Sequence, residues 1–362
     1  MTSVAKPKVF GTGLIALDLV LGLNPMSPVR SWAGGTCGNV LSILAYLGWD
    51  AFPIARMNGD PASERVRADL AHWGVHLDFA NCSPAAHTPI IIQEIRRGKD
   101  GKLRHRFSWS CPQCGEWLPS FKPVTTAAVQ AVTPALDNAS VFFLDRLSRA
   151  ALSLAKEASE RGAVIVFEPS GKGTDKLMAE AIDLAHIVKY ADQRLATLGG
   201  VINKGAATIV EVQTLGEQGL KYRHRFGRSW SKWIHIGAVP APRLADTCGS
   251  GDWCTAGLIA KVAAGGVGGF HDVGADGLRA ALRYAQSLAA WNCGFEGARG
   301  GMYVVARDAF DAQIAALLAG ELDHLADAVD EPKTGSLIDC PACSTTSPKR
   351  RVASHRVRRV AA

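Results

Sequence analysis

The sequence lacks the features that mark membrane-embedded and disulfide-rich secreted proteins. No run of about 18 or more apolar residues occurs in it, so no membrane-spanning helix is expected. The apolar stretch 9–23 is interrupted by Asp18 and is followed by no small-residue cleavage site, which argues against a signal peptide. Nine scattered cysteines, an odd number, do not resemble a disulfide framework. We therefore expect a cytoplasmic protein with mostly reduced thiols.

The charge of the chain is concentrated at one end. Of its 362 residues, 48% are hydrophobic and 20% charged, which excludes a wholly disordered chain and a coiled coil. The formal net charge is +7, but six lysines and arginines lie within 349–359 with no acidic residue among them. We expect residues 331–362 to be a partly disordered basic tail, and contact of this tail with nucleic acid is the less favoured alternative.

Strand-like and helix-like segments alternate along residues 8–318, which predicts βαβ units and a mostly parallel sheet. Two strand-like runs, 89–96 and 103–109, break this alternation, and the glycine-containing segment 98–102 between them predicts a β-hairpin. We expect one domain over residues 1–330, with a small β lid at about 86–125. The predicted strands of the main sheet are 8–16, 141–144, 163–167, 187–190 and 207–214, and the predicted helices include 38–47, 148–161 and 174–184.

The segment most informative about chemistry is Gly249-Ser250-Gly251-Asp252, which precedes an apolar-periodic helix at 253–262. Glycines before a helix let consecutive backbone N–H groups turn toward one point, and the helix N-terminus adds partial positive charge there. Such a site suits a phosphoryl group in transfer, and a carboxylate beside it can accept a proton from an attacking hydroxyl. A simple turn with Asp252 as a helix cap is an equally good interpretation of this segment alone.

A second glycine-containing segment lies near the N-terminus. Gly34 and Gly35 allow a ligand to approach the backbone closely, and Asn39 offers both a donor and an acceptor at a helix start. These properties suit the recognition of sugar hydroxyls, although a glycine-rich turn capped by Asn39 is favoured when the segment is taken alone.

A third segment follows the strand 209–212 and contains Thr214, Gly216 and Gly219. Open α/β sheets bind ligands at strand ends of this kind. Taken alone, the segment indicates no more than a hairpin turn.

In this order and spacing, the three segments resemble those of the ribokinase-like (PfkB) carbohydrate and nucleoside kinases, over roughly residues 8–318. The most specific part is Asp246-Thr247-Cys248-Gly249-Ser250-Gly251-Asp252, which is similar to the family signature Asp-Thr-x-Gly-Ala-Gly-Asp. The resemblance implies a central, mostly parallel sheet with helices on both faces and a small β lid over the sugar site.

The resemblance also implies roles for individual residues. Asp252 matches the catalytic base, and Gly249, Ser250 and Gly251 match the anion hole. The implied substrate-binding residues are Asp18, Gly34, Gly35 and Asn39, and the implied nucleotide-binding residues are Thr214, Gly216 and Gly219. MgATP is the implied phosphoryl donor, and a sugar or nucleoside hydroxyl is the implied acceptor. Whether the chain forms a homodimer is left open.

Two departures from the family pattern stand out. Family members usually carry Asn-x-x-Glu where this chain has the stretch 190–194, Tyr-Ala-Asp-Gln-Arg. Either Asp192 compensates, or phosphoryl transfer is slow or absent, so a sugar or nucleotide sensor is an alternative to an enzyme. Glu168-Pro169-Ser170 likewise stands where many members place an Asp-led motif.

Two Cys-x-x-Cys pairs lie outside the kinase pattern, Cys111 with Cys114 and Cys340 with Cys343. Two thiolates on one tight turn suit neighbouring corners of a tetrahedral zinc site. Zinc is favoured over a redox pair or idle thiols, because prolines soon after the first pair argue against the helix that a redox pair needs. We expect one structural zinc ion held by all four cysteines.

Overall fold

The computed structural model describes residues 5–24, 29–83, 85–99, 101, 103–112, 114–170, 175–196, 198, 207–322 and 325. The predicted tail 331–362, with Cys340 and Cys343, lies outside these residues. In the described part of the chain, no single helix is long and apolar enough to cross a bilayer; one pair, Ser250–Val262 with Gly266–Asp272, reaches that length and composition only together, and it is bent by 87°.

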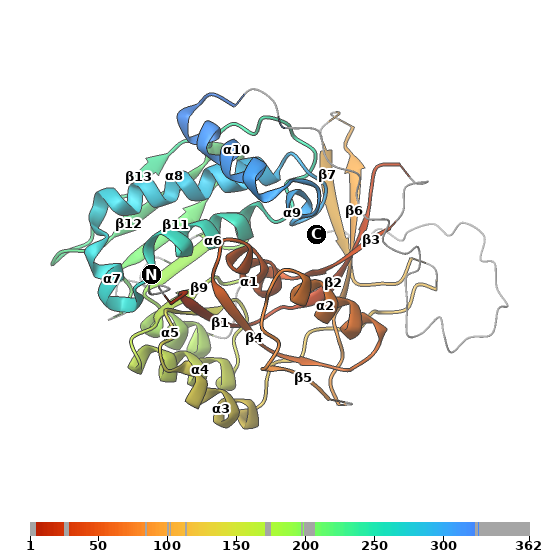
Figure 1. The fold of residues 1–362 in the computed structure, drawn as a ribbon, viewed down its shortest axis with the longest axis horizontal. Helices are drawn as coiled ribbons and strands as arrows, with labels where there is room; N and C mark the ends of the chain where they lie inside the picture. Colours follow the sequence, from red (N-terminus) through yellow and green to blue (C-terminus); the bar gives the residue numbers. More distant parts are fainter. Residues whose placement is uncertain are drawn as a thin grey trace.

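A nine-stranded sheet forms the centre of the molecule, in the order β13-β12-β11-β10-β9-β8-β1-β4-β5 (Figure 1). The strands from β11 to β5 in that order pair in parallel, whereas β12 and β13 are antiparallel. Their bounds are β1 Lys8–Thr12, β4 Asp50–Met57, β5 Ala80–Cys82, β8 Val141–Leu144, β9 Val164–Phe167, β10 Ile187–Ala191, β11 Val210–Thr214, β12 Leu220–His224 and β13 Ile234–Ile236.

Helices cover both faces of this sheet because its central strands are apolar on both sides. In β8, Val141 and Phe143 join the core on one face, and Phe142 and Leu144 join the core on the other. Continuous apolar runs of this kind are typical of parallel strands buried on both faces.

The first core packs under α1 Thr36–Tyr46, α2 Pro61–His72, α6 Ser250–Val262, α8 Gly274–Asn292 and α10 Arg307–Ala319. The second packs under α3 Thr126–Val132, α4 Arg149–Glu160 and α5 Asp175–Leu184, which lie together at the bottom of Figure 1. The short helices are α7 Gly266–Asp272, α9 Gly300–Val304, η1 Thr133–Leu136 and η3 Gly216–Gln218. The predicted α/β class with helices on both faces is confirmed.

A second sheet of four strands stands beside the main one, in the order β3-β2-β6-β7 (Figure 1). Its strands are β2 Ala16–Leu21, β3 Arg30–Gly34, β6 Ile90–Arg97 and β7 Leu103–Ser108. The hairpin expected within 89–109 is present, since β6 and β7 pair antiparallel. Sequence reasoning missed β3, which comes from the N-terminal region together with β2.

One predicted strand is wrong in its extent. The run 8–16 was expected to be continuous, but β1 ends at Thr12 and the chain then passes to β2 in the other sheet. The Leu14 N–H donates to the Asp145 carboxylate at 2.9 Å instead of to a neighbouring strand. A Cβ at Gly13 would lie 1.6 Å from Asp145 Oδ1, so the chain can turn here only at a glycine.

Candidate active site

The first turn of α6 forms the phosphate side of the candidate site. Gly249 precedes the helix with φ +75°, a left-handed conformation that favours glycine. A Cβ there would also lie 2.2 Å from the carbonyl oxygen of Ala298. The N–H groups of the first turn have no partner within the helix, and they carry its partial positive charge. The sequence predicts an anion hole at Gly249, Ser250 and Gly251, and these residues do form the turn before α6 and its first residues. Binding of an anion there stays a prediction.

A buried ion pair lies beside this turn. Lys189 Nζ, from β10, is 2.9 Å from Glu168 Oε1 at the end of β9, and the lysine side chain is 1% exposed. Thr255 of α6 donates from its hydroxyl to the same glutamate. A Cβ placed on Gly251 would lie 3.9 Å from both Glu168 Oε1 and Lys189 Nζ, so the pair borders the first turn of α6.

Asp252 is half-buried in the first turn of α6, and its Oδ2 accepts a hydrogen bond from Asn39 Nδ2 at 2.7 Å. Burial raises the pKa of Asp252 to about 7, and the negative charge of Glu168 adds to the rise. The Asn39 hydrogen bond and the positive charges of Arg194 and Lys189 oppose it. The carboxyl group of Asp252 therefore changes between its protonated and ionised forms near neutral pH.

Asp18, Gly34 and Gly35 lie together at the junction of β2, β3 and α1. A Cβ on Gly34 would lie 1.9 Å from Asp18 Oδ2, so only glycine lets the two strands approach at this point. Burial raises the pKa of Asp18 to about 7, against the charge of Arg299 and a backbone hydrogen bond from Gly35. In the described part of the chain, the buried Asp18 Oδ1 has no hydrogen-bond partner.

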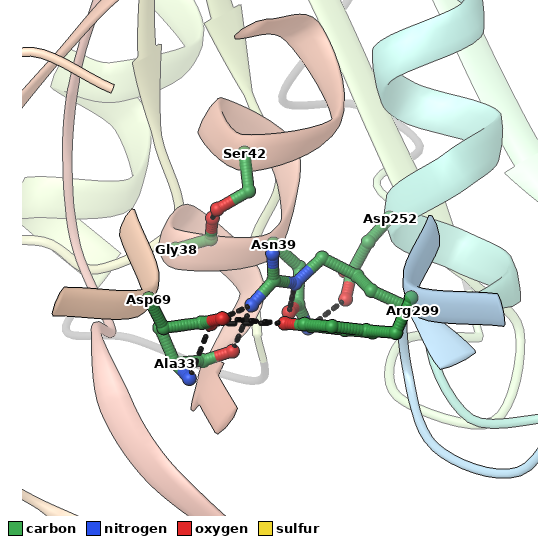
Figure 2. A network of polar contacts seen from close by, with 8 residues as sticks. Ala33, Gly38, Asn39, Ser42, Asp69, Asp252 and Arg299 are labelled. Atoms are coloured by element: carbon green, nitrogen blue, oxygen red, sulfur yellow. Dashed lines mark hydrogen bonds and ion pairs between the residues drawn. The ribbon is translucent and has the colours of Figure 1, made fainter. Parts of the chain in front are cut away.

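A polar network centred on Arg299 connects these two sides of the site (Figure 2). Arg299, next to α9, donates from Nε to Asn39 Oδ1 at 3.1 Å. Its Nη2 donates to Asp69 Oδ2 of α2 at 2.7 Å and also to the carbonyl oxygen of Ala33. Asn39 thus contacts Arg299 through its oxygen and Asp252 through its nitrogen.

The carboxylate of Asp246, in the segment that leads into α6, contacts residues of the four-stranded sheet. Gln93 of β6 donates to Asp246 Oδ2, and His105 of β7 lies 3.5 Å from Oδ1. The backbone N–H groups of Cys248 and Gly297 donate to the same carboxylate at 3.0 and 2.9 Å. Burial alone would raise the pKa of Asp246, but these hydrogen bonds and His105 leave it lowered, which keeps the carboxylate ionised.

Thr214, Gly216 and Gly219 form a tight connection between β11 and β12. Leu215 N–H donates to the Gly219 carbonyl at 2.8 Å, and Gly219 N–H donates to Gly216 at 3.0 Å. Thr214 pairs with Ala191 at the carboxyl end of β10. The segment is thus a hairpin at the strand ends, on the neighbouring strand to the one that carries Lys189.

The first cysteine pair lies on a closed turn after β7. Gly115 N–H donates to the Cys111 carbonyl at 2.9 Å, and Cys111 N–H donates to the Glu116 carbonyl at 2.8 Å. Cys111 is buried and Cys114 is exposed. No group of three or more histidine, cysteine or acidic side chains placed to hold a metal ion occurs within the described residues.

Sequence reasoning missed Arg299 and Asp69, the two residues that join the segments it had found. Arg299 lies in the glycine-rich stretch 294–301, which is the one local signal that could have drawn attention to it. Asp69 lies inside α2 with no motif around it, so nothing in the sequence indicates its partners.

The family of the chain follows from a comparison with family models. Residues 22–303 match the model of the pfkB family of carbohydrate kinases. The match extends over most of the chain and includes β3, β6 and β7 of the small sheet, α6 and the Arg299 network. The chain belongs to the pfkB family.

Solved structures of sugar and nucleoside kinases share the fold. The chain is similar to a fructokinase from Xylella fastidiosa with bound ATP, with a TM-score of 0.67 and 16% identity over 88% of this chain and 99% of that one. It is also similar to the Arabidopsis thaliana ribokinase complexed with ribose and ATP, with a TM-score of 0.62 and 18% identity over 87% and 99%. A Burkholderia thailandensis nucleoside kinase in complex with inosine has a TM-score of 0.61 and 18% identity over 85% and 96%. No curated protein sequence matches the chain closely enough to count as a relative.

Proposed function

We propose that the protein transfers the γ-phosphoryl group of ATP to a hydroxyl of a sugar or nucleoside, with Asp252 as the general base. The observation that supports this most directly is the position of Asp252. It follows Gly251 in the anion-binding turn, and its carboxylate also contacts Asn39, 2.7 Å away in the other half of the site. An acceptor hydroxyl bound there would lie between a proton acceptor and a phosphoryl group.

The chemistry of Asp252 fits this role. A general base is most effective when its pKa lies near the working pH, and burial raises the pKa of Asp252 to about 7. Asp252 takes the proton as the hydroxyl oxygen bonds to the γ-phosphorus and the bond from this phosphorus to the bridging oxygen of ADP breaks, so that ADP leaves. The first-turn N–H groups of α6 stabilise the negative charge of the phosphoryl group in transfer. MgATP supplies that group and the charge of the metal, which is held chiefly by phosphates and water.

The nucleotide half of the proposed site takes in the hairpin of Thr214, Gly216 and Gly219. Gly216 has φ +58° and is exposed, and an added Cβ would meet nothing within 4 Å, so its backbone is open to a ligand. At Gly219, with φ +91°, a Cβ would lie 2.2 Å from the Ile236 carbonyl oxygen, so the turn depends on glycine. We assign ATP contact to this turn.

The acceptor half takes in Asp18, Gly34, Gly35 and Asn39. The buried, unpartnered Asp18 Oδ1 is available to accept a hydrogen bond from a hydroxyl. Ribose and inosine are the molecules bound in two of the similar structures, and both carry adjacent hydroxyls. This supports a sugar or nucleoside as the acceptor class.

A sensor that binds these molecules without turnover is the second candidate. It is favoured by the stretch 190–194, which holds Ala191 and Arg194 and lacks the Asn-x-x-Glu pattern. Against it, the positive charge of Arg194 acts on Asp252 and lowers its pKa. A cation close enough to affect the base is also able to attract the phosphates of ATP.

We also propose that Cys111, Cys114, Cys340 and Cys343 hold one structural zinc ion. The support is the closed turn at Cys111, on which two thiols stand three residues apart. Two large side chains on either side of this turn, Trp109 and Trp117, are 49% and 78% exposed. A tail bound through zinc would cover part of that surface.

ATP consumption measured across a panel of sugars and nucleosides tests the proposed function. The kinase proposal expects turnover with at least one acceptor, and that turnover should be lost in Asp252→Asn. Binding of an acceptor without ATP consumption, in both the native protein and Asp252→Asn, would support the sensor instead. Neither binding nor turnover with any acceptor would remove both candidates.

A further inference from the structure

Arg299 is a deeply buried charged group one side chain away from the candidate base, since Asn39 contacts both residues. Its side chain is 1% exposed and pairs with Asp69 at 2.7 Å, where the carboxylate is 12% exposed. Asp69 also accepts the Ala33 N–H at 2.8 Å and the Tyr303 hydroxyl at 2.9 Å. A buried guanidinium with this many partners is held in one orientation.

The fixed guanidinium determines the orientation of the Asn39 amide. A guanidinium carries only donors, so the group that meets Arg299 Nε must be an acceptor, which is Asn39 Oδ1. Asn39 Nδ2 then points to Asp252 Oδ2 at 2.7 Å. The opposite amide orientation would set two donors against each other at Arg299 and two acceptors against each other at an ionised Asp252.

The same argument links the amide to the protonation of Asp252. An ionised carboxylate only accepts hydrogen bonds, and the amide in its observed orientation offers it a donor. A protonated carboxyl would gain from the opposite orientation, because its O–H would then donate to the amide oxygen. Arg299 disfavours that orientation, and so it disfavours the protonated acid.

We propose that Arg299 is a positioning residue that keeps the base Asp252 ionised by fixing the side-chain amide of Asn39. This inference deepens the proposed function and rests on it where turnover is concerned. Arg299, Asn39 and Asp252 come from three separate parts of the chain, and Figure 2 shows them in one row with Asp69 at the far end.

Three other charged groups act on Asp252, namely Glu168, Lys189 and Arg194. The charge of Asp252 in turn raises the pKa of the Cys37 and Cys248 thiols. Glu168 raises the pKa of Asp252, while Arg194 and Lys189 lower it. Lys189 is itself paired with Glu168 at 2.9 Å, so their two charges partly cancel at Asp252. Among side chains of the described residues, Asn39 is the one that donates a hydrogen bond to Asp252, which makes its orientation decisive.

The test measures the pKa of Asp252 directly, without any substrate. Protein labelled with ¹³C at the aspartate Cγ is titrated by NMR, and the Asp252 signal is assigned by its loss in Asp252→Asn. In Arg299→Gln, whose amide offers either polarity to Asn39, we expect the Asp252 pKa to rise by about one unit. Arg299→Lys keeps a cation that only donates hydrogen bonds. In this variant the pKa of Asp252 should rise by no more than half as much as in Arg299→Gln. The control Arg161→Met removes an arginine that pairs with Asp137 and Glu157 at the end of α4, before β9, whereas Glu168 follows the other end of that strand. It should leave the pKa unchanged.

A double-mutant cycle separates relay through Asn39 from a direct effect of the arginine charge. Asn39→Ala should raise the Asp252 pKa at least as much as Arg299→Gln, and the double variant should raise it no further than Asn39→Ala alone. Additive shifts, or no shift in folded Arg299→Gln, would overturn the proposal. If Arg299→Gln does not fold, Arg299→Met takes its place in the cycle, with the same expected and contrary results.

Turnover supplies an independent outcome. The acidic limb of the kcat–pH profile should move to higher pH in Arg299→Gln, while KM for ATP stays unchanged. A loss of rate that is equal at every pH would show a merely structural role and overturn the proposal. If the Asp252 pKa shifts in Arg299→Gln but the native protein shows no turnover, the relay through Asn39 is supported and the kinase function is refuted. If the native protein shows turnover but the Asp252 pKa does not shift in Arg299→Gln, the kinase function is supported and the relay is refuted.

Discussion

The two halves of the candidate site are built in different ways. The proposed phosphate side is local: Gly249, Ser250 and Gly251 are consecutive at the start of α6, and their proposed role rests on backbone N–H groups. The proposed acceptor side combines Asp18 of β2, Asn39 of α1 and the distant Arg299, and its proposed role rests on side chains. The comparison teaches that a backbone site depends on glycine and chain geometry, whereas a side-chain site depends on a network of exact donors and acceptors.

The largest expected effect comes from the residue that belongs to both halves. Asp252→Asn should reduce turnover by about 10²–10⁴-fold, the range that general-base catalysis typically contributes. Folding and ATP affinity should stay near those of the native protein, because the amide keeps the shape of the carboxylate. Turnover with the acceptor identified in the panel and ATP binding by calorimetry check this prediction. Turnover equal to the native rate would show that Asp252 is not the base.

Substitutions on the acceptor side should separate the two halves by affinity. Asp18→Ala and Asn39→Ala should each weaken acceptor binding by about 1–3 kcal/mol, the cost of losing a buried hydrogen bond, and should leave ATP binding nearly unchanged. Separate titrations with acceptor and with ATP provide the measurement. Loss of ATP affinity with normal acceptor affinity would mean that the two half-sites are exchanged.

One methyl group added at Gly249 should destabilise the turn before α6. Gly249→Ala places a Cβ 2.2 Å from the Ala298 carbonyl oxygen at φ +75°, which should reduce the free energy of unfolding by about 1–3 kcal/mol and lower turnover. Gly268→Ala in α7 is the matched control, because an added Cβ there meets nothing within 4 Å. Urea unfolding of both variants checks the prediction. Equal stabilities would show that the turn before α6 tolerates a side chain.

The acceptor side should also respond to pH. The folded-state pKa of Asp18 is raised to about 7 from an ordinary value of 3.8, so the folded protein binds the proton more tightly than the unfolded chain. Stability from this group is therefore present below about pH 4 and is lost as the pH rises toward 7. Asp18→Asn should be more stable than the native protein at pH 8, by on the order of 1–3 kcal/mol, with a smaller difference at pH 5. The midpoints of urea unfolding of Asp18→Asn and of the native protein, measured at pH 8 and pH 5, check this prediction. A stability advantage of Asp18→Asn that is larger at pH 5 than at pH 8 would contradict it.

The smallest effect on the kinase core is expected from the zinc site. Metal analysis should find about one zinc ion per chain, held by four thiolates. Truncation after Leu337 should remove the metal and leave the core folded with its turnover. Zinc that remains after truncation would show that the two cysteine pairs do not share one ion, and a metal-free full-length protein would return them to idle thiols.

Much of the fold follows from local patterns. The strand Val141–Leu144 and the helix Arg149–Glu160 agree with prediction, because an apolar run and a serine cap specify them locally; Ser148 indeed accepts the Ala151 N–H at 3.1 Å. The central strand β4, the short strand β5 and the strands β12 and β13 at the other edge of the sheet were missed. Edge strands depend on pairing with the finished sheet, and their own residues carry little periodicity.

The sequence by itself determined the parallel α/β architecture and the motif that ends in Asp252, because hydrophobic periodicity and glycine conformation are properties of neighbouring residues. Only the tertiary structure decided what Asp252 touches. The Asn39 amide contacts Asp252 from 213 residues away, and the Arg299 guanidinium contacts Asn39 from 260 residues away. These hydrogen bonds exist only when α1, α6 and the segment before α9 have packed together. Donor–acceptor matching among distant side chains leaves no periodic pattern in the sequence, so the protonation of Asp252 is a property of the folded molecule.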